Sequence, residues 1–524
     1  MAPGLSVFRS FRQWLVSALC SISITLAGCS QIEDAYVKLS SAAVQNQAPI
    51  TLELWHGFTG QEQEVIETLA EEFNASAGVE NRIQLYLTGY DNLSGLADAV
   101  FLAVQEEAEK TDDLSRLPDL FFSFDDTAYV LDRMGWAVHM EDFLSEEQRG
   151  MFLDSVQAEA CPGENGSMVL FPVGIDTDIL LVNESRWEDF CRGTSLDGMP
   201  QFTDADLMTW EGVRNVAKAY KEWGSSGREV DPDEASSQPD AVSPSLPGFR
   251  SGTFFCTDSW GRLMVAGYES LGGHMFDSGL DSIKFSFDRR RVRSFWNFWN
   301  NGWMDGAFAQ VSCKDAFSSG KAVACLTSTT QARSISNRVI SDNNTAGWVQ
   351  VSIRPAPSFS GGNPVTMQET LGLVLTKSSK EKQAAAQIFL QWLLDSRLTD
   401  LAVATGRLPA VKSYTASGNL QESFRKMGLS SLEQDILNQA KEQLYSHIQL
   451  PLAVFDGGSR VIDTMDQFLL VGGKQVRQKF MEALPTGDEQ QIRDDMTNDF
   501  AYEDWYLSCR DTVVDLVLIR QKAA

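Results

Sequence analysis

The stretch from Thr51 to Asn74 constrains the fold most, because it has the pattern of a strand, a tight turn and a helix. Thr51–Trp55 mostly favours β-structure, His56–Gly60 interrupts it, and apolar residues then recur at helical spacing over Val65–Phe73. This order predicts the opening βα unit of an α/β sheet. Ligands of open α/β sheets bind beyond the carboxyl ends of the strands, so we expect the turn to face a cleft.

Two more strand patterns follow this unit. Ile83–Leu87 alternates apolar and polar residues and precedes an apolar helical face over Leu93–Val104. Leu117–Phe124 is largely apolar, as in a strand buried on both faces, and leads into the carboxylates of Asp125 and Asp126. This order of elements predicts parallel strands joined by helices.

A chain of 524 residues is too long for one compact core, so we expect two or more α/β lobes. Val169–Asn183 reads as a strand with a polar bend, which is typical of a segment that crosses between lobes. The region from Ser431 onward is predominantly helical in pattern. The predicted boundaries are 50–172 and 308–365 for lobe one, and 173–307 and 366–524 for lobe two, with a surface insertion at 224–248.

Residues 1–28 are predicted to be a signal peptide. Arg9 and Arg12 precede an apolar or small run over Trp14–Leu26, which is too short for a membrane-spanning helix. Leu-Ala-Gly-Cys at the end of this run resembles the bacterial lipobox, which implies that Cys29 is acylated and anchors the protein to a membrane outside the cytoplasm. Residues 29–49 then form a polar tether. A plain signal peptide with an incidental cysteine is the alternative.

The net charge excludes one class of partner. Removal of residues 1–28 takes away Arg9 and Arg12 and no acidic residue, which changes the formal net charge from −28 to −30. Such a charge disfavours binding to nucleic acid. It does not exclude an anionic ligand, because salt screens distant surface charges over about 8–10 Å.

The cysteines permit disulfides in an exported protein. Besides Cys20 and Cys29, six remain. These six are Cys161, Cys191, Cys256, Cys313, Cys325 and Cys509. Their spacing indicates no metal site, and the locally plausible pairs are Cys313 with Cys325 and Cys161 with Cys191.

The familiar catalytic and cofactor motifs are absent from the sequence. It contains no G-x-S-x-G, H-E-x-x-H, phosphate-binding or dinucleotide-binding loop, so we expect no metal and no cofactor. Asp125 with Asp126, or Asp176 with Asp178, could serve as the paired carboxylates of a glycoside hydrolase. Carboxylates at strand ends are equally suited to accept hydrogen bonds from ligand hydroxyls, so we predict a binding protein and not an enzyme.

The order of several short motifs resembles the extracellular solute-binding proteins, family 1, of ABC importers. These motifs include Leu-Trp-His-Gly-Phe-Thr-Gly from Leu54, Phe-Ser-Ser-Gly-Lys-Ala from Phe317 and Thr-Gly-Arg-Leu-Pro from Thr405. The resemblance implies the two-lobed periplasmic-binding-protein fold, whose lobes close on a small solute and present it to a membrane permease. It also implies a monomer in the cell envelope that faces the periplasm or the exterior.

Within that family, the sequence looks most similar to the glycerol-3-phosphate and glycerophosphodiester binders. Arg460, in Arg-Val-Ile, matches their phosphate-binding arginine. Two positions depart from their pattern, since Glu369 lies near their paired glycines and Arg407 replaces a tyrosine. The ligand-binding residues that the resemblance implies are Tyr90, Asp125, Asp176, Trp260, Ser328, Thr329, Gln368, Glu369, Arg407 and Arg460.

These positions predict a phosphorylated glycerol as the ligand, either glycerol-3-phosphate or a glycerophosphodiester. The guanidinium of Arg460 can bind a phosphate with two parallel hydrogen bonds. An uncharged sugar is the alternative, because Asp125 or Glu369 could neutralise Arg460 from the protein side. A secreted glycoside or phosphodiester hydrolase is the less favoured alternative.

Overall fold

The computed structural model describes residues 48–109, 117–160, 163, 166–196, 200–225, 253–279, 282–308, 311–340, 346–413, 418–451 and 458–523. Ile50–Ala524 forms one compact unit. The predicted signal peptide, Cys29 and most of the tether lie outside the described residues, as does most of the predicted insertion at 224–248.

The first lobe is built from the predicted βα units. Strand β1 (Ile50–His56) pairs in parallel with β2 (Ile83–Gly89) and with β3 (Leu120–Ser123), which confirms the parallel order. Helices α3 (Gln61–Ala75) and α5 (Leu93–Glu109) follow β1 and β2. The buried residues of both helices belong to the same hydrophobic cluster as the buried residues of β1. Burial alternates along β1, because successive side chains of a strand point to opposite faces of the sheet.

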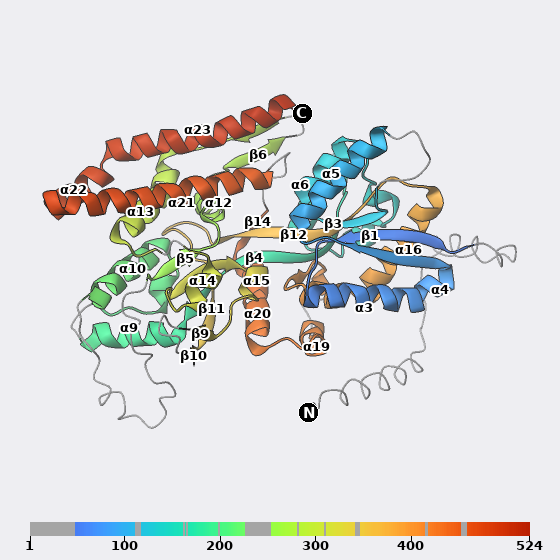
Figure 1. The fold of residues 1–524 in the computed structure, drawn as a ribbon, viewed down its shortest axis with the longest axis horizontal. Helices are drawn as coiled ribbons and strands as arrows, with labels where there is room; N and C mark the ends of the chain where they lie inside the picture. Colours follow the sequence, from blue (N-terminus) through green and yellow to red (C-terminus); the bar gives the residue numbers. More distant parts are fainter. Residues whose placement is uncertain are drawn as a thin grey trace, which may run out of the picture. The chain divides into compact units, whose positions relative to one another are not determined.

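Two long strands run side by side from one lobe to the other. All thirteen residues of β4 (Phe171–Asn183) are buried, and its first half pairs antiparallel with β12 (Val365–Leu375). The second half of β4 pairs with β8 (Ala324–Ser328) and β11 (Val351–Pro355) of the second lobe. The sheet order is β2-β1-β3-β12-β4-β8-β5, with β5 spanning Phe255–Thr257 (Figure 1).

Aromatic helices form much of the second core. Helix α13 (Arg289–Asp305) begins at Asp288, whose side chain accepts hydrogen bonds from two backbone N–H groups of the first turn. It ends at Gly306, which has the left-handed φ of 66° that glycine adopts without strain. Its buried residues recur at helical spacing and include Trp296, Trp299 and Trp303. Such a wide apolar stripe requires helices to pack on α13 from more than one side.

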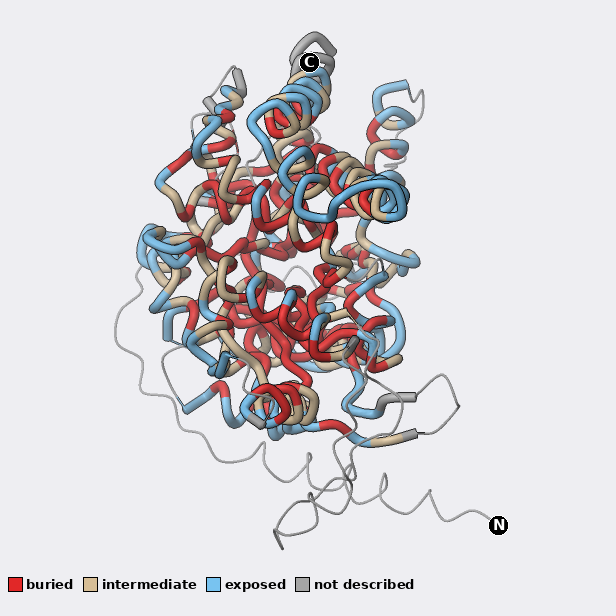
Figure 2. Tube along the Cα trace, turned by 90° about the vertical axis from the view of Figure 1, so that its left-hand side faces the viewer, coloured by how far each residue is buried: buried red, intermediate tan, exposed pale blue. Residues whose placement is uncertain are grey.

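The C-terminal region is helical, as predicted. Helix α21 (Gly458–Ala483) packs against α12 (Trp260–Ser270), α13 and α23 (Asp499–Ala523), and α21 and α23 lie next to each other in Figure 1. Buried segments of the chain run through the interior, and exposed turns of the helices face outward (Figure 2). Among the described residues, no helix combines the length and apolarity that crossing a membrane requires.

The hydrophobic clusters divide the chain differently from the predicted lobe boundaries. One cluster joins residues 52–175 with residues 371–440, and another joins 180–367 with 461–513. The predicted boundaries place 308–365 in lobe one and 366–524 in lobe two. Instead, β8 belongs to lobe two because it pairs with β5 and with the second half of β4, and α16 (Lys380–Ser396) belongs to lobe one because it packs on β1.

The disulfide prediction is confirmed for one pair and wrong for the other. Cys313 is bonded to Cys325, while Cys191 is a free thiol. Cys191 lies on α9 (Glu184–Leu196) against the second cluster, and Cys161 lies outside the described residues. The prediction of this disulfide used only the spacing of the cysteines along the chain, and spacing does not show in which direction a helical side chain points.

Candidate ligand-binding site

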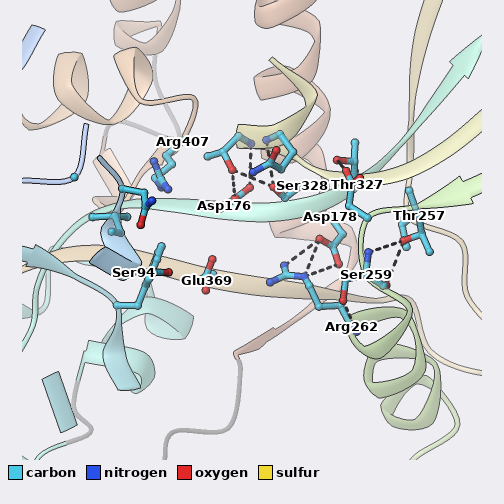
Figure 3. A pocket seen from close by; sticks show the side chains of 18 of the residues that line it. Ser94, Asp176, Asp178, Thr257, Ser259, Arg262, Thr327, Ser328, Glu369 and Arg407 are labelled. Atoms are coloured by element: carbon cyan, nitrogen blue, oxygen red, sulfur yellow. Dashed lines mark hydrogen bonds and ion pairs between the residues drawn. The ribbon is translucent and has the colours of Figure 1, made fainter. Parts of the chain in front are cut away.

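A pocket of about 450 Å³ lies where β4 and β12 cross between the lobes, a size in the range of small-molecule sites. Gly57 and Phe58 contribute to its wall from the turn after β1, as the opening βα unit predicts. The lining residues are Gly57, Phe58, Glu62, Asn92, Leu93, Ser94, Phe124, Asp176, Asp178, Thr257, Asp258, Ser259, Arg262, Leu326, Thr327, Ser328, Thr330, Gln331, Glu369 and Arg407. Figure 3 shows most of these side chains.

Asp176 lies at the centre of the pocket wall and is bonded within the protein. Its carboxylate accepts hydrogen bonds from Thr329 Oγ1 at 2.6 Å, from the Thr330 hydroxyl and from the Thr330 backbone N–H at 3.3 Å. These donors lie in α15 (Thr329–Ala332), a single turn capped by Ser328. Asp176 therefore links the crossing strand to lobe two. Hydrogen bonds from Thr329 and Thr330 already use both oxygens of its carboxylate in the ligand-free protein.

Asp178 forms a buried ion pair with Arg262, on the first turn of α12. The Nε and Nη2 atoms of Arg262 lie 3.0–3.3 Å from the carboxylate oxygens. Ser259 caps α12 by accepting a hydrogen bond from the Arg262 backbone N–H. Burial disfavours the charge on Arg262, but the carboxylates of Asp178 and Glu369 raise its pKa. The guanidinium thus stays charged and is directed toward Asp178.

Glu369 and Arg407 flank Asp176 in the pocket (Figure 3). Glu369 lies opposite Asp176 in the register of β12 with β4, and Arg407 precedes the short strand β13 (Leu408–Pro409), which pairs with the other side of β4. Arg407 Nη1 donates to the Thr405 carbonyl oxygen at 3.0 Å. Its buried Nε has no hydrogen-bond partner in the described part of the chain.

A second set of carboxylates lies behind the pocket. Glu159, on α8 (Asp154–Ala160), accepts hydrogen bonds from Gln368 Nε2 at 2.6 Å and from the Thr370 hydroxyl. Burial raises the pKa of Glu159 to about 7, although these hydrogen bonds oppose the shift. Burial and the Glu159 charge raise the pKa of Asp125 well above its ordinary value, and Asp125 Oδ2 has no partner among the described residues.

We predict that Glu159 makes stability depend on pH. Its pKa is about 7 when folded and 4.5 ordinarily, so between these values the folded protein holds a proton that the unfolded chain has lost. Stability must therefore fall as pH rises through this window, by up to about 1.4 kcal/mol per pH unit. Glu159→Gln removes this group, so urea unfolding from pH 4.5 to 8 should show a shallower fall.

The control for this prediction is Glu147→Gln, which alters an exposed carboxylate. It should leave the pH profile of the wild type unchanged. A Glu159→Gln profile as steep as that of the wild type would show that Glu159 is ionised in the folded protein throughout this range.

The structure brings some of the ten predicted site residues together and not others. Asp176, Ser328, Glu369 and Arg407 line the pocket, and Thr329 supports Asp176. Asp125 and Gln368 are buried and do not line it. The resemblance to the phosphoglycerol binders identified the ten positions in the sequence. It did not show in which direction each side chain points.

Three predicted residues lie away from the pocket. Trp260 packs in the aromatic core against Phe255 and Phe308. Tyr90 stacks at an angle on Trp55 with 5.2 Å between ring centroids, and it is not among the lining residues. Arg460, the predicted phosphate ligand, is exposed near the start of α21. Its exposure means that its charge needs no anion from a ligand.

Sequence reasoning missed Arg262 and Asp258 as pocket residues, and it considered Asp178 only as a possible carboxylate partner of Asp176. The signal for Asp178 was that it follows Asp176 by two positions on the crossing strand and so shares its face. Arg262 and Asp258 carried no such signal, because they belong to a lobe-two segment that meets Asp178 of β4 and Thr327 of β8 only in the folded protein.

Comparisons with known proteins agree with this architecture. Residues 68–425 match the family described as bacterial extracellular solute-binding protein. Comparison with curated protein sequences finds no match.

Solved structures of similar fold include three ligand-binding proteins. The cyclic alpha-maltosyl-1,6-maltose binding protein of Arthrobacter globiformis is 14% identical with a TM-score of 0.59, over 85% of this chain and 98% of that one. UgpB of Mycobacterium tuberculosis, in complex with glycerophosphocholine, is 17% identical with a TM-score of 0.58, and the match covers 86% of this chain and 100% of UgpB.

The galacto-N-biose/lacto-N-biose I-binding protein of Bifidobacterium longum, in complex with lacto-N-biose, is 13% identical with a TM-score of 0.58. The match covers 90% of this chain and 98% of that protein. Identities this low establish the fold and no more. The predicted two-lobed periplasmic-binding-protein fold is thereby confirmed.

Proposed function

Because this chain belongs to the bacterial extracellular solute-binding proteins, we propose that it captures a polyhydroxylated solute in the pocket and delivers it to the permease of an ABC importer. The observation that carries the proposal is the position of the pocket, where two strands cross between the lobes. Closure of the lobes about β4 and β12 would enclose the solute and give the permease one state to recognise.

The lining suits a ligand with many hydroxyl groups. Carboxylates and hydroxyls line much of the pocket, and lobe one adds the apolar surfaces of Phe58, Leu93 and Phe124. A sugar ring presents C–H groups on its faces and hydroxyls at its edges, so it complements both kinds of surface. A carbohydrate is our first candidate.

A glycerophosphodiester is the second candidate, favoured by Arg407. Arg407 lines the pocket, and a guanidinium can donate charge-assisted hydrogen bonds to a phosphate oxygen. Arg460 gives this candidate no support, because it is exposed and does not line the pocket.

The family acts outside the cytoplasm, and we propose that Cys29 anchors this chain to the membrane there. The sequence motif is the support for the anchor, since Cys29 lies outside the described residues. We also infer that the protein is a monomer that binds its solute without chemical change.

Calorimetry combined with product analysis tests the proposal. Maltose and glycerophosphocholine represent the two candidates, and we expect at least one of them to bind with one site per chain and to be recovered intact. Release of glucose, glycerol phosphate or choline at catalytic rates would show that the protein is a hydrolase. Glutamate, which carries no polyol, serves as the control and should give no heat of binding.

A further inference from the structure

The charged groups of the pocket are unequal in sign. Among the described lining residues, five carboxylates face two guanidiniums. The carboxylates belong to Glu62, Asp176, Asp178, Asp258 and Glu369, and the guanidiniums to Arg262 and Arg407. A ligand enters a site that carries excess negative charge.

Two of these carboxylates are neutralised by arginines of the protein. Asp178 is paired with Arg262 at 3.0 Å. Glu62 lies 3.7 Å from Arg333, which is outside the pocket lining and also pairs with Glu433 at 3.0 Å. Asp176, Asp258 and Glu369 then remain against the single guanidinium of Arg407.

Hydrogen bonds within the protein occupy two of the three remaining carboxylates. Asp176 is bonded to Thr329 and Thr330, and Asp258 accepts from the Cys313 backbone N–H at 2.9 Å and from the Thr327 hydroxyl. No such donor reaches Glu369 from the described residues, and in Figure 3 its carboxylate extends into the pocket without a bond to its neighbours. Glu369 is therefore the carboxylate left for the ligand.

We propose that the ligand is a hydroxylated molecule that carries an ammonium group, which Glu369 binds, together with an acceptor oxygen for Arg407. This inference rests on the proposed function and narrows its ligand class. If the ligand is a carbohydrate, the inference predicts an amino sugar. If the ligand is a glycerophosphodiester, it predicts one whose head group carries an ammonium. It disfavours glycerol-3-phosphate, since a phosphate monoester carries about −1.5 to −2 charge at pH 7.

The surroundings of Glu369 agree with this selection. Burial raises its pKa to about 7, and the carboxylates of Asp176 and Asp126 act in the same direction. The guanidiniums of Arg262 and Arg407 oppose the shift, and the buried Asp125 also interacts with Glu369. An ammonium group brought against Glu369 must lower its pKa, so binding at pH 7 should release protons.

Calorimetry with two matched pairs of probes tests the proposal. Chitobiose with free amino groups is compared with cellobiose, in which hydroxyls replace the amines. Glycerophosphocholine is compared with glycerophosphoglycerol, which lacks the ammonium group. We expect the ammonium member of at least one pair to bind about 10-fold or more tightly than the member that lacks the ammonium group, and the pair that responds identifies the source of the ammonium.

Variants assign this preference to Glu369. Glu369→Gln should reduce the preference within the responding pair to about 3-fold or less, because the amide removes the charge and keeps the shape. Asp154→Asn removes the same charge from an exposed position and should retain the full preference. For the wild type, titrations of glycerophosphocholine, whose quaternary ammonium carries no proton, in buffers of different ionisation enthalpy at pH 7 should show proton release.

The outcomes separate the inference from the proposed function. If neither maltose nor any of the four probes binds, the proposed capture of a polyol fails, and the inference fails with it. If maltose binds and the four probes do not, or if the members of each pair bind with equal affinity, the inference alone is overturned. Preference for the member without ammonium, or proton uptake on binding glycerophosphocholine, also overturns the inference alone. A preference that persists unchanged in a folded Glu369→Gln protein also overturns it.

Discussion

Replacing Asp178 with asparagine is expected to lower the free energy of unfolding by about 3–5 kcal/mol. The substitution removes the charge that faces Arg262, whose side chain is only 14% exposed, and leaves that guanidinium without its partner. An unpaired buried charge costs much more than an exposed one, because water no longer solvates it. Urea unfolding of the ligand-free protein measures the change.

The exposed pair of Arg289 with Glu503 is the matched control. Its side chains are 54% and 41% exposed, so Glu503→Gln should cost less than about 1 kcal/mol. A second variant, Asp178→Asn with Arg262→Met, removes both charges and should recover much of the lost stability. Equal costs for Asp178→Asn and Glu503→Gln would show that Arg262 is solvated or neutralised without Asp178.

Replacing Arg407 with alanine is expected to weaken glycerophosphocholine binding by roughly 30-fold or more, equivalent to about 2–5 kcal/mol. Arg407 is 7% exposed and lines the pocket, and its guanidinium can donate charge-assisted hydrogen bonds to a phosphate oxygen. Calorimetric titration of the wild type and Arg407→Ala measures the loss, and circular dichroism establishes that the variant is folded.

Arg460→Ala is the control for Arg407, because it removes the same charge from an exposed position away from the pocket. Its affinity should stay within about 2-fold of the wild type, which is the scatter of a surface substitution. A loss at Arg460 as large as that at Arg407 would restore the phosphate role that the sequence motif suggested for Arg460.

Local patterns predicted the secondary structure of lobe one well. The βα units from Thr51 to Ser123 follow from strand alternation, helical periodicity and an apolar run, all of which act between residues close in sequence. The crossing strand at Phe171–Asn183 was also predictable. Its sequence is apolar on both sides of a short polar segment, as expected for a strand that is buried along its whole length. The helical C-terminal region has the same local origin.

The membership of the lobes was not predictable in this way. Residues 308–365 and 366–440 have patterns that suit either lobe, and strand pairing decides between them. β8 joins lobe two because five of its residues pair with β4, a choice made by residues about 150 positions apart. No local property of the chain encodes such a distant partner.

The same distinction holds for the site. The sequence by itself determined the βα turn at Gly57, the crossing strand with Asp176, and the unusual charges of Glu369 and Arg407. Only the tertiary structure decided that Arg262 neutralises Asp178, that Trp260 is core, and that Arg460 is exposed. Residue type and local spacing establish what a side chain can do, whereas its burial and its partners depend on which distant segments fold against it.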